Sequence, residues 1–322
     1  MSTKLAAKKI KLSRDSRQNI VILLAFAAML ALFGSLSEYF LTGKNFITLL
    51  NSAVPLGLIG IGQCYCLLTG SFDMSVGMTA SFAGIIWTRL ITDFDMPIYA
   101  AFAIGIAFGL ASGLLNGWAV AYMKMPAWIA TYATMQMWQG IIYIITEGEA
   151  VRMTKYKAFK WLGQHKCFGT NVPPAVIIMV CLFILAYFVL KYTKLGRDLY
   201  IIGGNIEAAK NTGIRIKRGQ MFVFTVSGFM AALAGLLFAS RSGSGQPIIG
   251  DQYAMQAIAG TVIGGTAMTG GKANIAMTFI GVMMVVCLQN GLIMAGVPAF
   301  YQHIATGAAV VLAIWVQTER KK

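Results

Sequence analysis

Charged residues are scarce in this chain of 322 residues: they make up 11% of it, while hydrophobic residues make up 57%. An ordinary soluble domain carries about 25% charged residues. Apolar runs recur from near residue 20 to near residue 317 without a long polar break. This composition excludes a soluble globular protein and predicts one continuous membrane domain.

Histidine is almost absent, with His165 and His303 as its only two occurrences, and the five cysteines form no CxxC pair. Zinc sites need several histidine or cysteine ligands at short spacings, so we expect no metal site. An enzyme would need paired acid–base groups or a metal within reach of its substrate. No such cluster is visible, and we therefore expect no catalytic residue and no enzymatic activity.

The glycine-rich stretch 264–273 does not complete a phosphate-binding loop. Gly271 and Lys272 follow an apolar run, but Thr266 stands where the motif needs its first glycine. Ala273 lacks the hydroxyl that would hold magnesium. We expect no cofactor in this chain, and if transport uses ATP, another polypeptide hydrolyses it.

Apolar runs of the length needed to cross about 30 Å of hydrocarbon, roughly 20 residues, occur about ten times. The fold class predicted is an all-α integral membrane protein, a polytopic bundle of about ten transmembrane helices. The second, third and eighth runs are broken by glycines and by Asp73, so they could be tilted, short or re-entrant. The predicted spans are 19–37, 52–70, 75–92, 97–123, 126–145, 173–191, 220–240, 253–269, 274–296 and 298–317.

Lysine and arginine collect in three segments, and short basic loops tend to remain in the cytoplasm. These segments are a basic tail over 1–18, a loop over 192–219 within the transmembrane domain 19–317, and a tail over 318–322. Both termini are therefore expected in the cytoplasm of a multi-pass protein of the inner membrane. In this arrangement the loop 146–172 lies on the extracytoplasmic side of the membrane, although it is also basic. The net charge of +15 fits anionic membrane lipid at the span ends rather than nucleic acid.

Glycines recur every fourth residue in the fourth span, at Gly105, Gly109, Gly113 and Gly117. They form a stripe without side chains, and such stripes let transmembrane helices approach closely. We predict tight packing against another helix, with a sliding surface as the alternative.

Asp73 is flanked by long apolar runs on both sides. A charge at the bilayer centre costs at least ~2.5–3.5 kcal/mol, so this residue must be paired or lie at an aqueous interface. We expect it to cap the N-terminus of the third span, where a carboxylate can accept backbone N–H groups. A role in a transport gate or an ion pair is the alternative.

The segment 194–214 encodes a short helix with both ends marked. Asn205 is placed to be the N-cap, Glu207 lies in the first turn, and Gly213 ends the helix. Isolated helices below about 12 residues are marginal in water, so this one needs a surface on which to pack. Small Ala208 and Ala209 would allow close approach, and a cytoplasmic partner protein is the natural candidate.

The chain resembles a known family in several motifs that occur in order. The run Ile202-Gly203-Gly204-Asn205, followed by Ala208-Ala209 and Gly213-Ile214, resembles the coupling loop of ABC-importer permeases of the ribose class. The other matching stretches are 73–77, 241–247, 253–266, 290–292 and 301–302. The departures are Ser71, Phe72 and Ala273, none of which lies in the coupling loop.

The resemblance implies a permease subunit that translocates a ribose-like monosaccharide delivered by an extracytoplasmic binding protein. It implies pairing with a second permease copy or a paralogue, and two ABC ATPases docked on the 194–214 loop. A furanosyl autoinducer or a nucleoside is an alternative substrate, and an ion-coupled secondary transporter is an alternative class. The expected coupling residues are Gly203, Gly204, Asn205, Glu207, Ala208, Ala209 and Gly213. The pathway or gate candidates are Asp73, Ser75, Asn116, Arg241, Gln246, Asn290 and Gln302.

Overall fold

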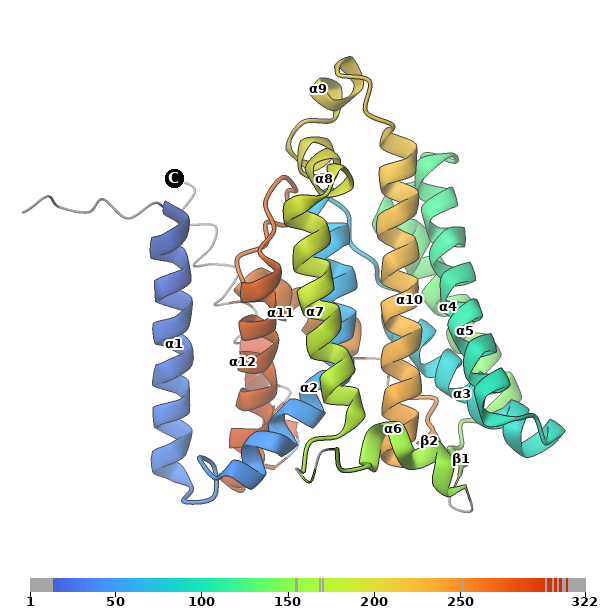
Figure 1. The fold of residues 1–322 in the computed structure, drawn as a ribbon, viewed down its shortest axis with the longest axis vertical. Coiled ribbons are helices and arrows are strands. Elements are labelled where there is room, and N and C mark those ends of the chain that lie inside the picture. The colour runs from blue at the N-terminus through green and yellow to red at the C-terminus, as the bar shows by residue number, and fades with distance from the viewer. Residues whose placement is uncertain are drawn as a thin grey trace, which may run out of the picture.

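The computed structural model describes residues 14–311 except 154, 155, 168, 170, 249, 251, 299, 303, 306, 309 and 310. Helices form nearly all of this part (Figure 1). They are α1 (Arg14–Leu36), α2 (Gly43–Leu68), α3 (Val76–Phe94), α4 (Ile98–Ala121), α5 (Ala127–Thr146), α6 (Trp161–Gln164), α7 (Pro174–Tyr192), α8 (Lys194–Gly204), α9 (Ile206–Asn211), α10 (Ile216–Ser242), α11 (Tyr253–Ile263) and α12 (Ile275–Met294). A 3-10 turn, η1, covers Lys157–Lys160.

Helices occupy nine of the ten predicted spans. Within the described residues, six of them are both long and apolar enough to cross a membrane: α1, α2, α4, α7, α10 and α12. The tenth predicted span, 298–317, and the tail 318–322 lie largely or wholly outside the described residues, as does most of the 1–18 tail. The first residues of α1 lie at the same end of the bundle as α8 and α9 (Figure 1), so the described residues 14–18 share one side with the basic loop 192–219.

Helix α2 begins nine residues before the predicted start of the second span. The Oγ1 atom of Thr42 accepts the backbone N–H of Asn45 at 3.3 Å, which caps the helix at its N-terminus. The predicted span began later because the apolar run is interrupted by Lys44, Asn45 and Asn51. A helix that is capped at its N-terminus can include such polar residues in its first turns.

Helix α11 corrects the prediction of an eighth span over 253–269. Its 11 residues make a helix about 16 Å long, roughly half of the hydrocarbon thickness. The helix stops at Gly264, and Gly265 follows with a φ of +89° that favours glycine. The eighth apolar segment is thus a short helix that cannot cross a membrane by itself.

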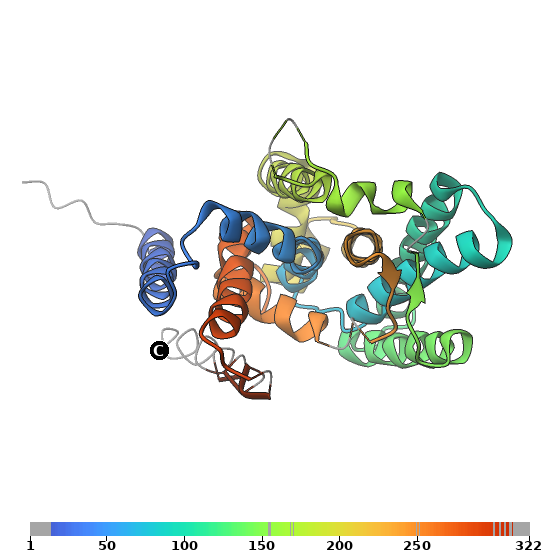
Figure 2. The same cartoon turned by 90° about the horizontal axis from the view of Figure 1, so that it is seen from below.

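Helices α2 and α10 form the centre of the bundle, as the view along the helices shows (Figure 2). Every residue of α2 from Ala53 to Leu68 is buried. A helix that is apolar all round is expected to be buried on all sides. Helix α1, by contrast, lies apart from the centre, and among the described helices it packs along α12 (Figures 1 and 2).

The glycine stripe of α4 packs directly on α10, which confirms the prediction of a tight seam. A Cβ atom added at Gly109 would overlap Ala232 Cβ and the carbonyl of Gly228. The same addition at Gly117 would lie 3.0 Å from Met221 Cα. The two backbones therefore touch along most of the length of the helices.

Replacing Gly109 with alanine should lower the stability of the protein, because the methyl group has no room against α10. Overpacking of this kind typically costs about 1–3 kcal/mol. Gly140→Ala in α5 is the matched control, since no heavy atom lies within 4 Å of a Cβ there. Thermal unfolding in detergent should show a lower midpoint for Gly109→Ala only, and equal midpoints for both variants would contradict the seam.

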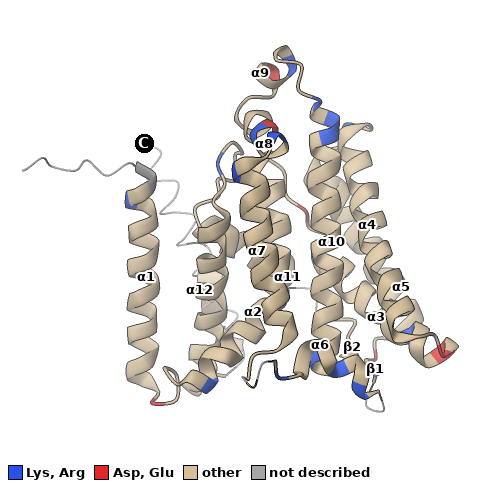
Figure 3. Cartoon of the chain, in the orientation of Figure 1, with Lys and Arg blue, Asp and Glu red and all other residues tan. Residues whose placement is uncertain are grey.

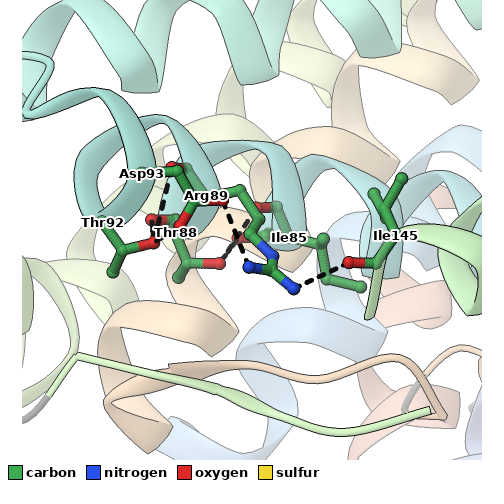
Figure 4. A network of polar contacts seen from close by, with 7 residues as sticks. Ile85, Thr88, Arg89, Thr92, Asp93 and Ile145 are labelled. Carbon is green, nitrogen blue, oxygen red and sulfur yellow. Dashed lines mark hydrogen bonds and ion pairs between the residues drawn. The ribbon is translucent and has the colours of Figure 1, made fainter. Parts of the chain in front are cut away.

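Most charged residues lie near the two ends of the bundle (Figure 3). At the end away from α8 and α9, a short antiparallel pair joins β1 (Val151–Arg152) to β2 (Ser244–Gly245), with Val151 opposite Gly245. An ion pair joins Arg89 and Asp93 of α3 at 3.2 Å. Arg89 also donates to the Ile145 carbonyl of α5 at 2.7 Å (Figure 4).

Candidate functional site

Asp73 lies in the non-helical segment that links α2 to α3, and its side chain is buried. Its Oδ1 accepts the backbone N–H of Ser75 at 2.9 Å and the Ser75 hydroxyl at 2.6 Å. Its Oδ2 accepts the hydroxyl of Ser227, from α10, at 2.8 Å. Both carboxylate oxygens are therefore satisfied by neutral donors, and one of these donors comes from the central helix α10.

The hydrogen bonds continue from Ser75 outward to α4 and α5. Asn116 Nδ2 of α4 donates to Ser75 Oγ at 2.9 Å, and Thr134 of α5 donates to Asn116 Oδ1 at 2.6 Å. All of these side chains are buried. We call the series Ser227, Asp73, Ser75, Asn116 and Thr134 the Asp73 network, and it joins α10, α4 and α5 to the start of α3.

Gln63 of α2 hydrogen-bonds to the backbone of the segment between α2 and α3. Its side-chain amide donates to the Asp73 carbonyl and its Oε1 accepts the Asp73 N–H at 3.3 Å. The next N–H, that of Met74, bonds to Thr131 Oγ1 of α5 at 3.1 Å. Irregular backbone within a membrane domain is tolerated where protein groups satisfy it, and these side chains do so.

The capping role expected of Asp73 is corrected by this geometry. The N-cap of α3 is Ser75, whose side chain bonds none of the free N–H groups of the helix. Asp73 lies two residues earlier, and it fixes the turn that leads into the helix rather than the first helical turn. Because it also bonds Ser227, Asp73 links α10 to the segment between α2 and α3.

The other pathway candidates lie away from this network. Arg241, near the C-terminal end of α10, donates to the Asn51 carbonyl and to Ser52 Oγ of α2, each at 3.0 Å. Gln246 bonds Ser244 Oγ at 3.3 Å.

Asn290 of α12 accepts from Asn45 of α2 at 3.1 Å, and Gln302 donates to the Val297 carbonyl at 2.9 Å. Of the seven candidates, the structure brings together only Asp73, Ser75 and Asn116. In the part of the chain that is described, no three His, Cys, Asp or Glu side chains gather so that they could hold a metal ion.

The coupling segment forms two helices, α8 and α9, that extend beyond the end of the bundle (Figure 1). Asn205 is the N-cap of α9, as predicted, and its Oδ1 accepts the N–H of Ala208 at 3.0 Å. Glu207 lies in the first turn, and Gly213 has a φ of +75° just after the helix ends. Glu207 and Ala208 are exposed.

Ala209 packs inside the chain rather than on the surface of α9, which corrects part of the prediction for this helix. Its side chain is fully buried within the chain and belongs to the main apolar core. Successive residues of a helix point in directions about 100° apart, and here Ala208 is exposed while Ala209 is buried. Ala208 belongs to the exposed surface of α9, whereas Ala209 attaches the helix to the rest of the protein.

Gly203 also makes its contacts inside the chain. A Cβ atom there would overlap the Leu68 carbonyl at the end of α2, and it would lie 2.6 Å from the Gly271 nitrogen. Gly271 itself donates to that carbonyl at 2.9 Å. No heavy atom lies within 4 Å of a Cβ at Gly204. The two neighbouring glycines thus differ: Gly203 fits α8 onto the end of α2, while Gly204 is exposed.

Several residues of these sites were missed from the sequence. Helix α8 has a signature that could have revealed it: Thr193 caps it by accepting the Gly196 N–H at 3.1 Å, and Leu199 and Ile202 face the core. Ile206 at the tip of α9 is 48% exposed, an apolar side chain outside the membrane span. The partners of Asp73 and Asn116, Ser227 and Thr134, carry no signal in the sequence.

Comparisons with known proteins all match this chain to transport permeases. A family model described as "Branched-chain amino acid transport system / permease component" matches residues 45–314. The ribose import permease protein RbsC of Escherichia coli (strain K12) is 32% identical over 302 residues, which cover 93% of each chain. RbsC of Bacillus subtilis (strain 168) is 34% identical and covers 89% of this chain and 88% of its own length.

The xylose transport system permease protein XylH of Haemophilus influenzae is 29% identical, over 97% of this chain and 99% of its own length. No solved structure matches.

Proposed function

This chain belongs to the permease family of branched-chain amino acid transport systems, and from that premise we propose that it is the membrane subunit of an ATP-binding-cassette importer for a monosaccharide. As a permease it is a multi-pass protein of the inner membrane and not an enzyme. The observation that carries the substrate class is its similarity to ribose and xylose permeases over nearly the whole length of both chains.

In this proposal an extracytoplasmic binding protein delivers the sugar, and a second copy of this chain or a paralogue completes the membrane part. Two ABC ATPases dock on the exposed surface of α8 and α9 and hydrolyse the ATP. What supports this docking site is its shape and chemistry: a six-residue helix that extends beyond the bundle and exposes Ile206, Glu207 and Ala208. Helices of this length are not stable alone.

A continuous set of contacts supports a route for the motion. Helix α9 follows α8, and Gly203 of α8 lies against Leu68 at the end of α2. Asp73 comes five residues after Leu68 and bonds Ser75 and Ser227. We infer that displacement of α8 and α9 by the ATPases reaches the break between α2 and α3, and through the Asp73 network reaches α4, α5 and α10.

An ion-coupled secondary transporter is the alternative class. Such proteins place carboxylates or broken helices near the bilayer midplane, and Asp73 beside the α2–α3 break fits that description in part. Within the described residues, however, Asp73 is the single buried carboxylate, and its partners are serine hydroxyls.

Transport measurements separate the two classes and the candidate substrates. The chain is reconstituted with its cognate ATPase and binding protein, and uptake of labelled ribose and xylose is measured with ATP and with an ion gradient. We expect ATP-dependent uptake of a pentose. Uptake that follows an ion gradient without ATP would overturn the proposal, and uptake of a nucleoside or a furanosyl compound alone would move the substrate to another class.

The proposed orientation places α9 in the cytoplasm, and Lys210 is exposed there. In a variant without the native cysteines, Lys210→Cys should react with an impermeant thiol reagent only after the inner membrane is opened. Labelling is followed by gel shift, and a cysteine at Lys157, near the opposite end of the bundle, is the control that should react in intact spheroplasts. Equal labelling of Lys210→Cys in intact and opened spheroplasts would contradict the orientation.

A further inference from the structure

A cavity opens where α7 ends, α8 begins and α12 starts. Its volume is about 330 Å³, within the range of small-ligand sites, which start near 300 Å³. Two cations, Lys191 and Arg197, line it together with the side chains of Tyr187 and Tyr200. No aspartate or glutamate contributes to the lining.

The cations of this cavity are available to an anion. Lys191 and Arg197 are exposed, and neither takes part in the ion pair between Arg89 and Asp93. Lys191 Nζ lies 2.6 Å from the Tyr187 hydroxyl and 5.1 Å from the centre of its ring. These contacts orient the ammonium group without neutralising its charge.

Two features of the surrounding backbone favour an anion in the same place. Asn274, which also lines the cavity, is the N-cap of α12, so the positive end of a 20-residue helix dipole lies at its edge. Tyr200 donates its hydroxyl to the Ala273 carbonyl at 3.0 Å, which satisfies an acceptor that would otherwise repel an anion. Burial raises the pKa of the Tyr200 hydroxyl, so this donor keeps its proton.

The neighbouring surface of α7 is apolar and exposed. Ile184 and Phe188 are 63% and 58% exposed, and they precede Lys191 by seven and three residues, so all three share one face of the helix. On a membrane-spanning helix such a face contacts acyl chains, and cations at its end meet headgroups. This arrangement distinguishes the cavity from the tip of α9, which extends away from the bundle (Figure 1).

We propose that this cavity binds the phosphate headgroup of an anionic phospholipid, with Lys191 and Arg197 on the phosphate and an acyl chain along Ile184 and Phe188 of α7. The bound lipid bridges α7, α8 and the start of α12. It thereby connects the surface proposed for ATPase docking to the bilayer, whatever sugar the protein carries.

Lipid titration of the purified full-length chain tests the site. Phosphatidylglycerol or phosphatidylcholine is added in neutral detergent, and bound lipids are counted by native mass spectrometry. We expect a preference for phosphatidylglycerol that falls about thirtyfold in the double variant Lys191→Gln/Arg197→Gln, since each of the two surface cations contributes about 1 kcal/mol to anionic lipid binding. The double variant Arg215→Gln/Arg218→Gln removes the same charge from exposed positions at the same end and should keep the preference.

An equal preference for phosphatidylglycerol in the two double variants would overturn the proposal. Displacement of the lipid by millimolar inorganic phosphate would also overturn it, because the site would then bind the free anion without needing the acyl chain. If the Lys191→Gln/Arg197→Gln variant kept its lipid but lost copurification of the ATPase, the cavity would be a protein contact. Failure of sugar uptake alone has no bearing on this result, so the lipid site and the proposed function are tested separately.

Discussion

Ala208→Arg is expected to abolish sugar uptake while the protein still folds and enters the membrane. Ala208 is exposed on α9, and arginine is a good helix former, so the helix itself should tolerate the change. The long charged side chain would nevertheless prevent close approach of the ATPase. We expect the ATPase to be lost on affinity purification of the variant, and uptake of labelled pentose to fall to background.

Two neighbouring variants make this result specific. Ala208→Ser keeps a small side chain and should retain the ATPase. Ala209→Arg places a charge at a fully buried position and should reduce the yield of folded protein instead, a different phenotype one residue away. Copurification of the ATPase with Ala208→Arg at the level of the unmodified protein, together with normal uptake, would show that α9 is not the docking helix.

Asp73→Ala is expected to destabilise the protein strongly and to stop transport. The substitution leaves the buried Ser75 N–H and the hydroxyls of Ser75 and Ser227 without their acceptor. Each unsatisfied buried donor costs about 1–3 kcal/mol, so a loss of roughly 3 kcal/mol or more is expected. Thermal unfolding in detergent and uptake in vesicles measure the two effects.

Asp93→Ala provides the comparison for a carboxylate that is not buried. Asp93 forms an ion pair with Arg89 (Figure 4), and its side chain is 40% exposed. Exposed ion pairs of this kind contribute about 0–1 kcal/mol. Asp73→Asn keeps the volume and one acceptor oxygen, and the Ser227 hydroxyl can turn to accept from the amide. We expect the unfolding midpoint of Asp73→Asn to lie between the midpoints of Asp73→Ala and the unmodified protein. Equal unfolding midpoints for Asp73→Ala and Asp93→Ala would refute the structural importance of the Asp73 network.

Apolar length predicted the positions of the helices, and six of those described are long and apolar enough to cross a membrane, because hydrocarbon thickness sets a requirement that any sequence must meet locally. The same criterion misplaced the ends of α2 and α11. At α2 the cap at Thr42 lies outside the apolar run. At α11 the helix depends on neighbouring helices rather than on its own length. Start and stop positions are thus set partly by contacts that a hydropathy pattern does not contain.

The sites were predicted unevenly for a related reason. The cap at Asn205 depends on residues three apart, so the sequence alone predicted it. Asp73 is bonded to Ser227, 154 residues away, and serine in an apolar helix gives no sign of its partner. The burial of Ala209 likewise depends on how α9 lies on the bundle. Local chemistry was therefore predictable, whereas pairing between distant segments required the structure.

The shortness of α11 has a consequence for how the chain enters the membrane during synthesis. A helix of 11 residues cannot be released into lipid alone, because its polar ends would lie inside the hydrocarbon. Its contacts are with α2, α3 and α12, of which α12 is synthesised after it. Biogenesis of the C-terminal part must therefore be cooperative: α11 waits beside the earlier helices at the translocation machinery until α12 has emerged.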